Sequence, residues 1–431
     1  MNFNDALEKA TQLAQARLPG LKEHVFLVRD LHGRIRLLLG KRRQPASEFY
    51  PHIQALIADI TQALGTYAYP ANDLIMYRED LKSIQLPEDG ASAVLAEDGA
   101  YKVCLHDRLL MGAEWMASPT GAPAIKRFTL FSMKGGVGRS TTATILGWHL
   151  AKKGKKVLVF DLDLESPGVG ATLLGSSLPR FGIVDWFVED ALGEGDRVLP
   201  DMVAVSDLGV ATEGKLSVVP CFGTDTGDFL PKLGRAYLER GPGGHEPWPH
   251  RLQRLVAAIE AQEKPDIVLL DSRTGLHDTS ASLILAMGAD TLMFAVDSRQ
   301  TWTAYRFLFE HWRSHPNVRD FRQKLWVIGS MVPRKDTDTY VEGLRDSAWD
   351  LFRATLYDQP ADDTENPSAT ADVFNFQSTD DAGNHHPRPV LWDEGLVAFD
   401  PLSAWQEGPV IAAYSSLFDW FDRTFLPEEA P

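Results

Sequence analysis

Cysteine is scarce in this sequence, and its scarcity excludes several classes of protein. Among 431 residues only Cys104 and Cys221 occur, far apart along the chain. Two isolated cysteines cannot form a disulfide framework, a cysteine-rich zinc module or an iron–sulfur cluster held by one chain. The remaining composition, 44% hydrophobic and 24% charged, is that of a globular protein long enough for two or three domains.

The sequence also lacks an excess of positive charge. Lys and Arg total 43 against 59 Asp and Glu, which gives a formal net charge of -16. Sequence-independent DNA binding depends on cations that neutralise phosphates, so this balance argues against it. The final residues, Phe425–Pro431, are acidic and interrupted by proline, so anionic lipid would repel them. We therefore expect no strong binding to DNA or membranes.

No segment has the pattern of a signal peptide or a membrane span. The first 18 residues are polar and mixed in charge. The most apolar stretch, Leu283–Val296, contains Asp290 and is too short to cross a bilayer. The sequence therefore predicts a cytoplasmic protein.

Residues 1–116 have the pattern of a small α+β domain. Asn4–Leu18 is periodic like a helix, and Val25–Val28 and Ile35–Leu39 flank a hairpin turn. We find no catalytic signature there and interpret the region as an adaptor domain that could bind a protein partner. Residues 117–124, with two prolines, a glycine and small side chains, are predicted to be a linker.

Residues 125–431 have a different pattern, in which short apolar runs alternate with helical segments. This alternation predicts an α/β domain with a mostly parallel, doubly wound sheet. Residues 358–389 are acidic and rich in Pro, Asn, Ser and Thr, and we interpret them as an insertion. His385 and His386 fall in that insertion and are predicted to lie in a solvated loop.

A glycine-rich turn follows the first apolar run of this region. Phe128–Phe131 is predicted to be a strand, and an apolar helical pattern begins after Thr141. Glycines between a strand and a helix let backbone N–H groups surround a phosphate, and the helix N-terminus adds a positive dipole end. The predicted phosphate-binding residues are Gly135, Gly136, Val137, Gly138, Arg139, Ser140 and Thr141. The Ser140 hydroxyl is also placed to ligate Mg²⁺.

The string from Lys134 to Ser140 resembles KGGxGK[ST], the deviant Walker A motif of the ParA/MinD-like ATPases. The resemblance covers roughly residues 125–426 and implies a P-loop fold, ATP and Mg²⁺ as cofactors, and an ATP-dependent homodimer. It further implies that Lys134, the additional lysine of the motif, contacts the nucleotide of the partner subunit. We therefore place Lys134 among the catalytic residues.

Arg139 departs from this motif, which has a second lysine at that position. Arginine is longer and planar and prefers bidentate contacts, whereas an ammonium is a compact point charge. We expect Arg139 to contact phosphates as a catalytic residue, with ATP and Mg²⁺ bound and hydrolysis slow. A loop that has lost turnover is the alternative.

Two further apolar runs end in carboxylates. Lys156–Phe160 leads to Asp161 and Asp163, and by resemblance Asp163 positions the attacking water while Asp161 lies near Mg²⁺. Asp266–Leu270 leads to Asp271, which is arranged like a Walker B aspartate that supports the metal. Two aspartates in turn positions are the structural alternative for the first pair.

Asp271 also opens a segment that resembles the second switch of the same family. Gly275 is then expected to approach the γ-phosphate with its N–H group. Arg273 replaces the usual proline. The pattern is compatible with two roles for it: a contact with phosphate or a partner subunit, or a solvated position in the loop. The choice of adenine as the base is implied only by the resemblance, because no residue pattern in the sequence selects a base.

The function predicted from these residues is an ATP-binding, slowly hydrolysing, dimeric molecular switch. The alternative is a nucleotide-binding scaffold that does not turn over and regulates a partner effector. Both functions use the same loop and differ only in the fate of the γ-phosphate.

Overall fold

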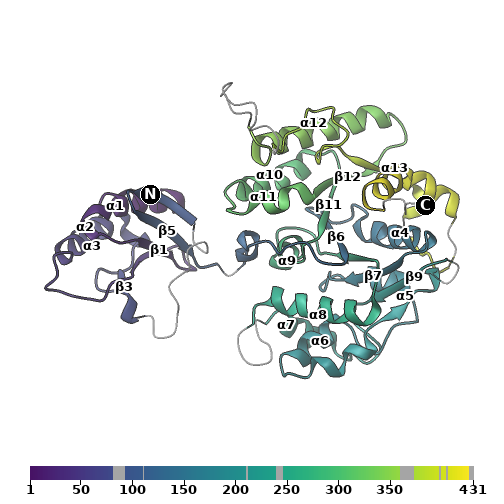
Figure 1. Ribbon diagram of the computed structural model, residues 1–431, viewed down its shortest axis with the longest axis horizontal. Coiled ribbons are helices and arrows are strands. Elements are labelled where there is room, and N and C mark those ends of the chain that lie inside the picture. Colours follow the sequence, from purple (N-terminus) through teal and green to yellow (C-terminus); the bar gives the residue numbers. More distant parts are fainter. Residues whose placement is uncertain are drawn as a thin grey trace. The chain divides into compact units, whose positions relative to one another are not determined.

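The computed structural model describes residues 1–80, 93–109, 111–209, 212–238, 246–359, 373–397, 399–403 and 406–426. The chain forms two compact units, Met1–Ala113 and Glu114–Pro431 (Figure 1). The central part of the predicted acidic insertion, residues 360–372, lies outside the described residues, as do residues 427–431 of the acidic C-terminal segment. Within the described residues, no helix is both long enough and apolar enough to traverse a bilayer.

The first unit is a mixed five-stranded sheet with helices packed on it. The strand order is β3-β2-β1-β5-β4, in which β1 pairs antiparallel with β2 and parallel with β5. The strands are β1 (Val25–Arg29), β2 (Ile35–Leu39), β3 (Ile75–Tyr77), β4 (Ala93–Asp98) and β5 (Tyr101–Asp107). The helices are α1 (Phe3–Gln15), α2 (Leu18–Leu21) and α3 (Tyr50–Leu64).

Apolar stripes at helical spacing hold this unit together. Ala6, Ala10 and Ala14 form the buried side of α1, and small side chains let α1 and α3 approach closely above the sheet. The predicted hairpin is confirmed, and the Asp30 carboxylate accepts backbone N–H bonds across its turn. The turn glycine, Gly33, has a φ of 83°, which side chains other than glycine adopt rarely.

The second unit contains an eight-stranded sheet in the order β13-β12-β11-β6-β10-β7-β9-β8. Every pairing is parallel except that of β8 with β9. The strands are β6 (Lys126–Ser132), β7 (Lys156–Asp161), β8 (Ala204–Val205), β9 (Lys215–Val219), β10 (Ile267–Asp271), β11 (Asp290–Ala295), β12 (Leu325–Val332) and β13 (Arg388–Leu391). The predicted α/β class with a mostly parallel sheet is therefore confirmed.

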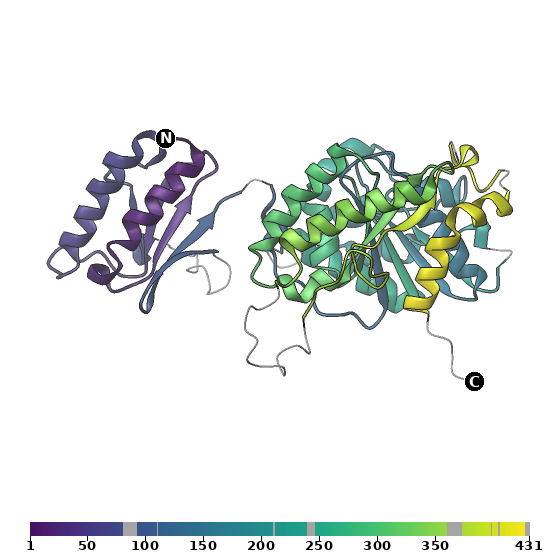
Figure 2. The same ribbon diagram turned by 90° about the horizontal axis from the view of Figure 1, so that it is seen from above.

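Helices cover both faces of this sheet (Figures 1 and 2). The helices are α4 (Arg139–Lys152), α5 (Val169–Leu174), α6 (Ile183–Asp190), α7 (Phe229–Ala236), α8 (Trp248–Glu263), α9 (Asp278–Leu285), α10 (Arg299–Arg313), α11 (Val318–Phe321), α12 (Thr337–Thr355) and α13 (Glu407–Phe425). Successive strand residues point to opposite faces, so Val157 and Val159 pack with α4, α5 and α13, whereas Leu158 and Phe160 pack with α6 and α8.

Residues 114–124 belong to the second unit. The Trp115 ring packs against Phe131 and Trp312 at centroid distances of 6.0 and 5.8 Å. The Thr120 N–H group donates to the carbonyl of Leu285. The Thr120 hydrogen bond attaches the predicted linker, residues 117–124, to the sheet-bearing unit, and the Trp115 ring attaches the residues just before it. The assignment of residues 1–116 as an adaptor stays a prediction.

The described part of the predicted insertion is packed where it follows α12. His385 has no exposed surface, and its ring nitrogens pair with the Tyr357 hydroxyl at 2.6 Å and the Ser378 carbonyl at 3.1 Å. Phe374 and Phe376 pack on the Tyr357 ring and close this cluster. The prediction of a solvated loop is therefore wrong for His385, because aromatic residues on both sides of residues 360–372 bury the described segment.

Candidate nucleotide-binding site

The glycine-rich loop joins the central strand β6 to α4. Gly136 and Gly138 have φ values of 74° and 81°, in the left-handed region that glycine adopts without strain. A Cβ atom at either position would meet nothing within 4 Å, so the space beside the loop is open. Gly138 caps the helix with no side-chain hydrogen bond, which leaves the first N–H groups of this 14-residue helix available to an anion.

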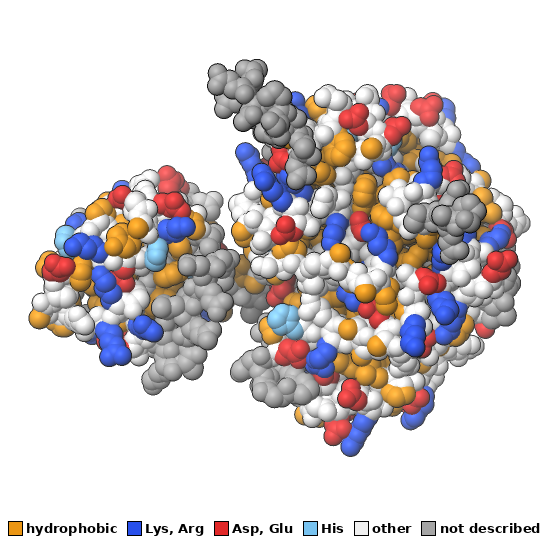
Figure 3. Space-filling view, in the orientation of Figure 1, with side chains coloured by type: hydrophobic (Ala, Val, Ile, Leu, Met, Phe, Trp, Pro, Cys, Tyr) orange, Lys and Arg blue, Asp and Glu red, His pale blue; other side chains and the backbone are white. Residues whose placement is uncertain are grey.

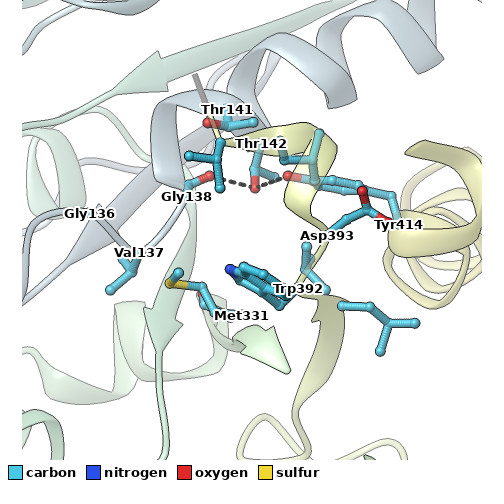
Figure 4. A pocket seen from close by; sticks show the side chains of 14 residues that line it. Gly136, Val137, Gly138, Thr141, Thr142, Met331, Trp392, Asp393 and Tyr414 are labelled. Carbon is cyan, nitrogen blue, oxygen red and sulfur yellow. Dashed lines mark hydrogen bonds between the residues drawn. The ribbon is translucent and has the colours of Figure 1, made fainter. Parts of the chain in front are cut away.

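A pocket of about 360 Å³ opens beside the loop. Its walls come from the loop and α4 on one side, and from the ends of β12 and β13 and from α13 on the other (Figure 4). In Figure 4 the Met331 and Trp392 side chains project into the space between the loop and the segment that carries Asp393. The lining residues are Gly136, Val137, Gly138, Thr141, Thr142, Ser330, Met331, Val390, Leu391, Trp392, Asp393, Leu396, Val397 and Tyr414.

Arg139, predicted to contact phosphates, points to carboxylates instead of into this pocket. Its Nε donates to Asp271 Oδ1 at 2.8 Å and its Nη2 to Asp163 Oδ2 at 3.0 Å. Its Nη1 lies 3.4 Å from Ser132 Oγ, and only 6% of the residue is exposed. Burial alone would lower the pKa of the guanidinium, but the two carboxylates outweigh that effect and raise it.

Ser140 and Asp271, two of the residues predicted for Mg²⁺, lie in direct contact. The Ser140 hydroxyl donates to Asp271 Oδ2 at 2.6 Å, so Arg139 and Ser140 together engage both oxygens of this buried carboxylate. Asp163 uses its other oxygen, Oδ1, to accept from the Ser166 N–H group at 3.3 Å. Desolvation raises the pKa of Asp163 despite the neighbouring guanidinium, which acts in the opposite direction.

Asp161, the third residue predicted for Mg²⁺, turns toward backbone. Its Oδ2 accepts from the N–H groups of Gly168 at 3.1 Å and Gly170 at 2.9 Å, where α5 begins. Complete burial and the nearby negative charge of Asp271 raise the pKa of Asp161 to about 8. This carboxyl group therefore fastens the loop that leads into α5.

Lys134 begins the loop, and Gly275 lies in the segment after β10 that contacts the end of β6. Lys134 is exposed and, within the part of the chain that the structure describes, makes no ion pair. Gly275 has a φ of 83° and donates its N–H group to the Ser132 carbonyl at 2.9 Å. That bond holds the segment after β10 against the loop. Thr274 Cγ2 lies 4.0 Å from the point where a Cβ atom on Gly135 would be.

Arg273 forms a contact that neither sequence interpretation anticipated. Its Nη1 lies 2.6 Å from Glu165 Oε1, so the pair links the segment after β7 to the segment after β10. Sequence reasoning also missed Trp392 and Met331 in the pocket wall. A signal for Trp392 was present, because it follows directly the short apolar run that forms β13.

Mg²⁺ does not fit this arrangement of side chains. Both Asp271 oxygens have donors, Asp163 faces Arg139, and Asp161 holds two amides. Within the described ranges, no group of three or more His, Cys, Asp or Glu side chains is placed to hold a metal ion. A nucleotide does fit, because open loop amides lie beside a partly apolar pocket.

Comparison with known proteins agrees with this geometry. Residues 128–270 match the family model of the CobQ/CobB/MinD/ParA nucleotide binding domain. Residues 128–270 of the second unit are ParA/MinD-like. The matched residues run from β6 through the loop and the strand end that carries Asp161 and Asp163 to Leu270, one residue before Asp271, which confirms the ParA/MinD-like P-loop fold expected from the sequence.

Curated relatives align with part of the chain. A cytosolic Fe-S cluster assembly factor of Neurospora crassa is 33% identical over 155 residues, 36% of this chain and 43% of the relative. One from Chaetomium globosum is 32% identical over 165 residues, 38% of this chain and 45% of the relative. The chain thus spans less than half the length of these relatives. A putative plasmid partition protein of Borrelia burgdorferi bound to AMPPNP has a TM-score of 0.43 and 15% identity, over 70% of this chain and 100% of that one.

Removing the central carboxylate should destabilise the ParA/MinD-like unit. Asp271→Ala leaves the buried Arg139 with one carboxylate and the Ser140 hydroxyl without its acceptor, so we expect a loss of about 3–5 kcal/mol in the free energy of unfolding. Glu165→Ala is the matched control, because its pair with Arg273 is partly exposed and contributes about 0–1 kcal/mol. Urea unfolding followed by circular dichroism measures both. Equal, small losses would mean that the Arg139–Asp271 pair does not stabilise this unit.

Proposed function

We propose that the chain is an ATP-binding molecular switch with slow hydrolysis. The observation that supports this most directly is the loop with free N–H groups at the edge of a pocket of about 360 Å³. Phosphates at the loop and a base in the pocket would use both features at once. The CobQ/CobB/MinD/ParA family match over these residues supports a nucleotide as the ligand.

Trp392 is the proposed platform for the base. The side chain is 40% exposed although it is large and apolar, and it projects into the pocket beside Met331 (Figure 4). Stacking on an aromatic ring accepts any base, so the choice of adenine rests on the family resemblance. The buried Ser330 hydroxyl also lines the pocket and has no hydrogen-bond partner within the described residues, so it could pair with a polar edge of the base.

Dimerisation is proposed from Lys134. Its exposed position at the start of the loop leaves the ammonium free to reach a second subunit. Two triphosphates buried in one interface repel each other strongly unless cations offset their charge. ATP would therefore join two copies, and loss of the γ-phosphate would release them.

Slow turnover is proposed from the contacts of Asp163. A carboxylate that positions an attacking water needs a free oxygen toward the γ-phosphate, whereas both Asp163 oxygens have donors in this structure. The same contacts support the alternative of a scaffold without turnover. Release of phosphate from ATP under single-turnover conditions distinguishes the two functions.

The names of the curated relatives suggest Fe–S cluster assembly as a second role, but the thiols of this sequence argue against cluster binding. Cys104 and Cys221 are both buried, and burial raises the pKa of the Cys221 thiol. A buried thiol resists the deprotonation that metal binding requires. We therefore propose nucleotide switching without a cluster on these cysteines. The proposal also places the protein in the cytoplasm, with a protein partner bound through the first unit.

Surface charge supports the expectation of weak binding to DNA and membranes. On the face shown in Figure 3, acidic and basic side chains are intermixed over the second unit. On this face the intermixed charges produce no extended positive potential that would attract phosphates or anionic lipid. The net charge of -16 acts in the same direction.

Lys134→Ala should separate binding from dimerisation. Because Lys134 is proposed to act on the partner's nucleotide, the variant should bind ATP within a few fold of the wild type and stay monomeric. Light scattering with and without ATP gives the mass, and a fluorescent ATP analogue gives the affinity. Lys9→Ala, an exposed lysine of α1, is the control and should dimerise normally. An unchanged ATP-dependent dimer in Lys134→Ala would assign the lysine to its own subunit.

Trp392→Ala should weaken nucleotide binding. Loss of the stacking platform should raise the dissociation constant about 5- to 150-fold, since base–aromatic stacking contributes about 1–3 kcal/mol. Trp392→Phe keeps an aromatic face and should retain most of the affinity. Isothermal titration with ATP measures the three proteins. If Trp392→Ala binds as tightly as the wild type, the base lies elsewhere.

A further inference from the structure

The Arg139 guanidinium lies where three strand ends of the parallel sheet meet. Asp163 follows β7, Asp271 ends β10 and Ser132 ends β6, and these three strands are neighbours in the sheet. In open α/β sheets the carboxyl ends of the strands form the ligand-binding edge. The cation supplied by Arg139 therefore occupies the acidic centre of that edge.

The carboxylates around this centre are occupied by donors from the chain itself. Asp271 accepts from Arg139 and Ser140, and Asp163 accepts from Arg139 and the Ser166 N–H group. Mg²⁺ requires near-octahedral oxygen ligands at about 2.0–2.1 Å, so it would have to displace these donors. A guanidinium can bridge two carboxylates because its N–H groups form a rigid fork, which a single ammonium cannot match.

The same guanidinium keeps donors for an anion. Of its five N–H groups, three are directed to Asp271, Asp163 and Ser132. The other two make no hydrogen bond within the described residues, and Arg139 is itself the first residue of α4, whose free N–H groups are the proposed phosphate site. A cation that contacts the carboxylates on one side and a phosphate on the other does what Mg²⁺ does in other P-loop proteins.

We infer that Arg139 takes the place of the divalent cation, so that this loop binds nucleotide without Mg²⁺. This inference rests on the proposed nucleotide binding. The guanidinium stays on Asp271 and Asp163 when nucleotide binds and neutralises part of the charge that a metal would otherwise offset. Arg139 is thus a positioning and charge-balancing residue of the site.

The test compares nucleotide affinity with and without a divalent cation in the full chain. A fluorescent ATP analogue is titrated in EDTA and in millimolar Mg²⁺ against the wild type and Arg139→Lys. We expect the two wild-type dissociation constants to agree within about threefold. Arg139→Lys restores a lysine that cannot bridge both carboxylates, and its affinity should fall at least about tenfold in EDTA.

A titration with Mn²⁺ alone, followed by electron paramagnetic resonance, decides the matter without nucleotide. Because Arg139 holds the carboxylates, the wild type should have a dissociation constant for Mn²⁺ above about 1 mM, which corresponds to a binding free energy weaker than about 4 kcal/mol. Two outcomes would overturn the inference and leave the proposed nucleotide site intact. In the first, the wild type binds the analogue only with Mg²⁺. In the second, the wild type binds one Mn²⁺, and Asp271→Asn abolishes that binding. Failure to bind the analogue in either buffer would instead refute the proposed function, and the Mn²⁺ titration would still judge Arg139.

Discussion

The ion pairs of Arg139 with Asp271 and Asp163 are the interaction on which the site depends. A buried guanidinium that loses a carboxylate partner costs about 3–5 kcal/mol, so the side chain is held firmly. A divalent cation about 4 Å from it would be repelled by about 8 kcal/mol at an effective dielectric constant of 20. The arginine and a metal ion therefore compete for the same carboxylate oxygens. The arginine has the advantage because it is part of the chain, whereas the ion must bind from solution.

The fold places these groups together from distant parts of the sequence. Parallel pairing of β7 and β10 aligns Asp161 with Asp271, and pairing of β10 with β6 brings Asp271 beside the start of the loop. The residues that hold the nucleotide in our proposal come from the other side of the loop, where β12, β13 and α13 form the pocket wall. Phosphate and base sites thus share the loop but depend on different strands.

Several features followed from local patterns alone. Apolar runs with a carboxylate at their end predicted β7 and β10, and the glycine string between a strand and a helical pattern predicted the loop before α4. Each of these signals lies within one short segment, where periodicity and backbone preference determine the outcome. The match of residues 128–270 to the nucleotide-binding family confirms the fold that they indicated.

Other features depended on contacts between distant residues. The direction of the Arg139 side chain is set by Asp271, 132 residues further along the chain, and a motif cannot specify that partner. Asp161 occupies the expected strand end, but Gly168 and Gly170 draw its carboxyl group away from the edge. His385 has the polar neighbours of a loop, yet Tyr357 and two phenylalanines bury it.

The most direct measurement is a crystal structure of the full chain with a non-hydrolysable ATP analogue and Mn²⁺, with anomalous data collected at the manganese edge. The account predicts the analogue on the glycine loop, Arg139 on Asp271 and Asp163 as in the present structure, and no manganese peak beside Ser140. A manganese ion on Ser140 Oγ, with the Arg139 side chain turned away from Asp271, would contradict it.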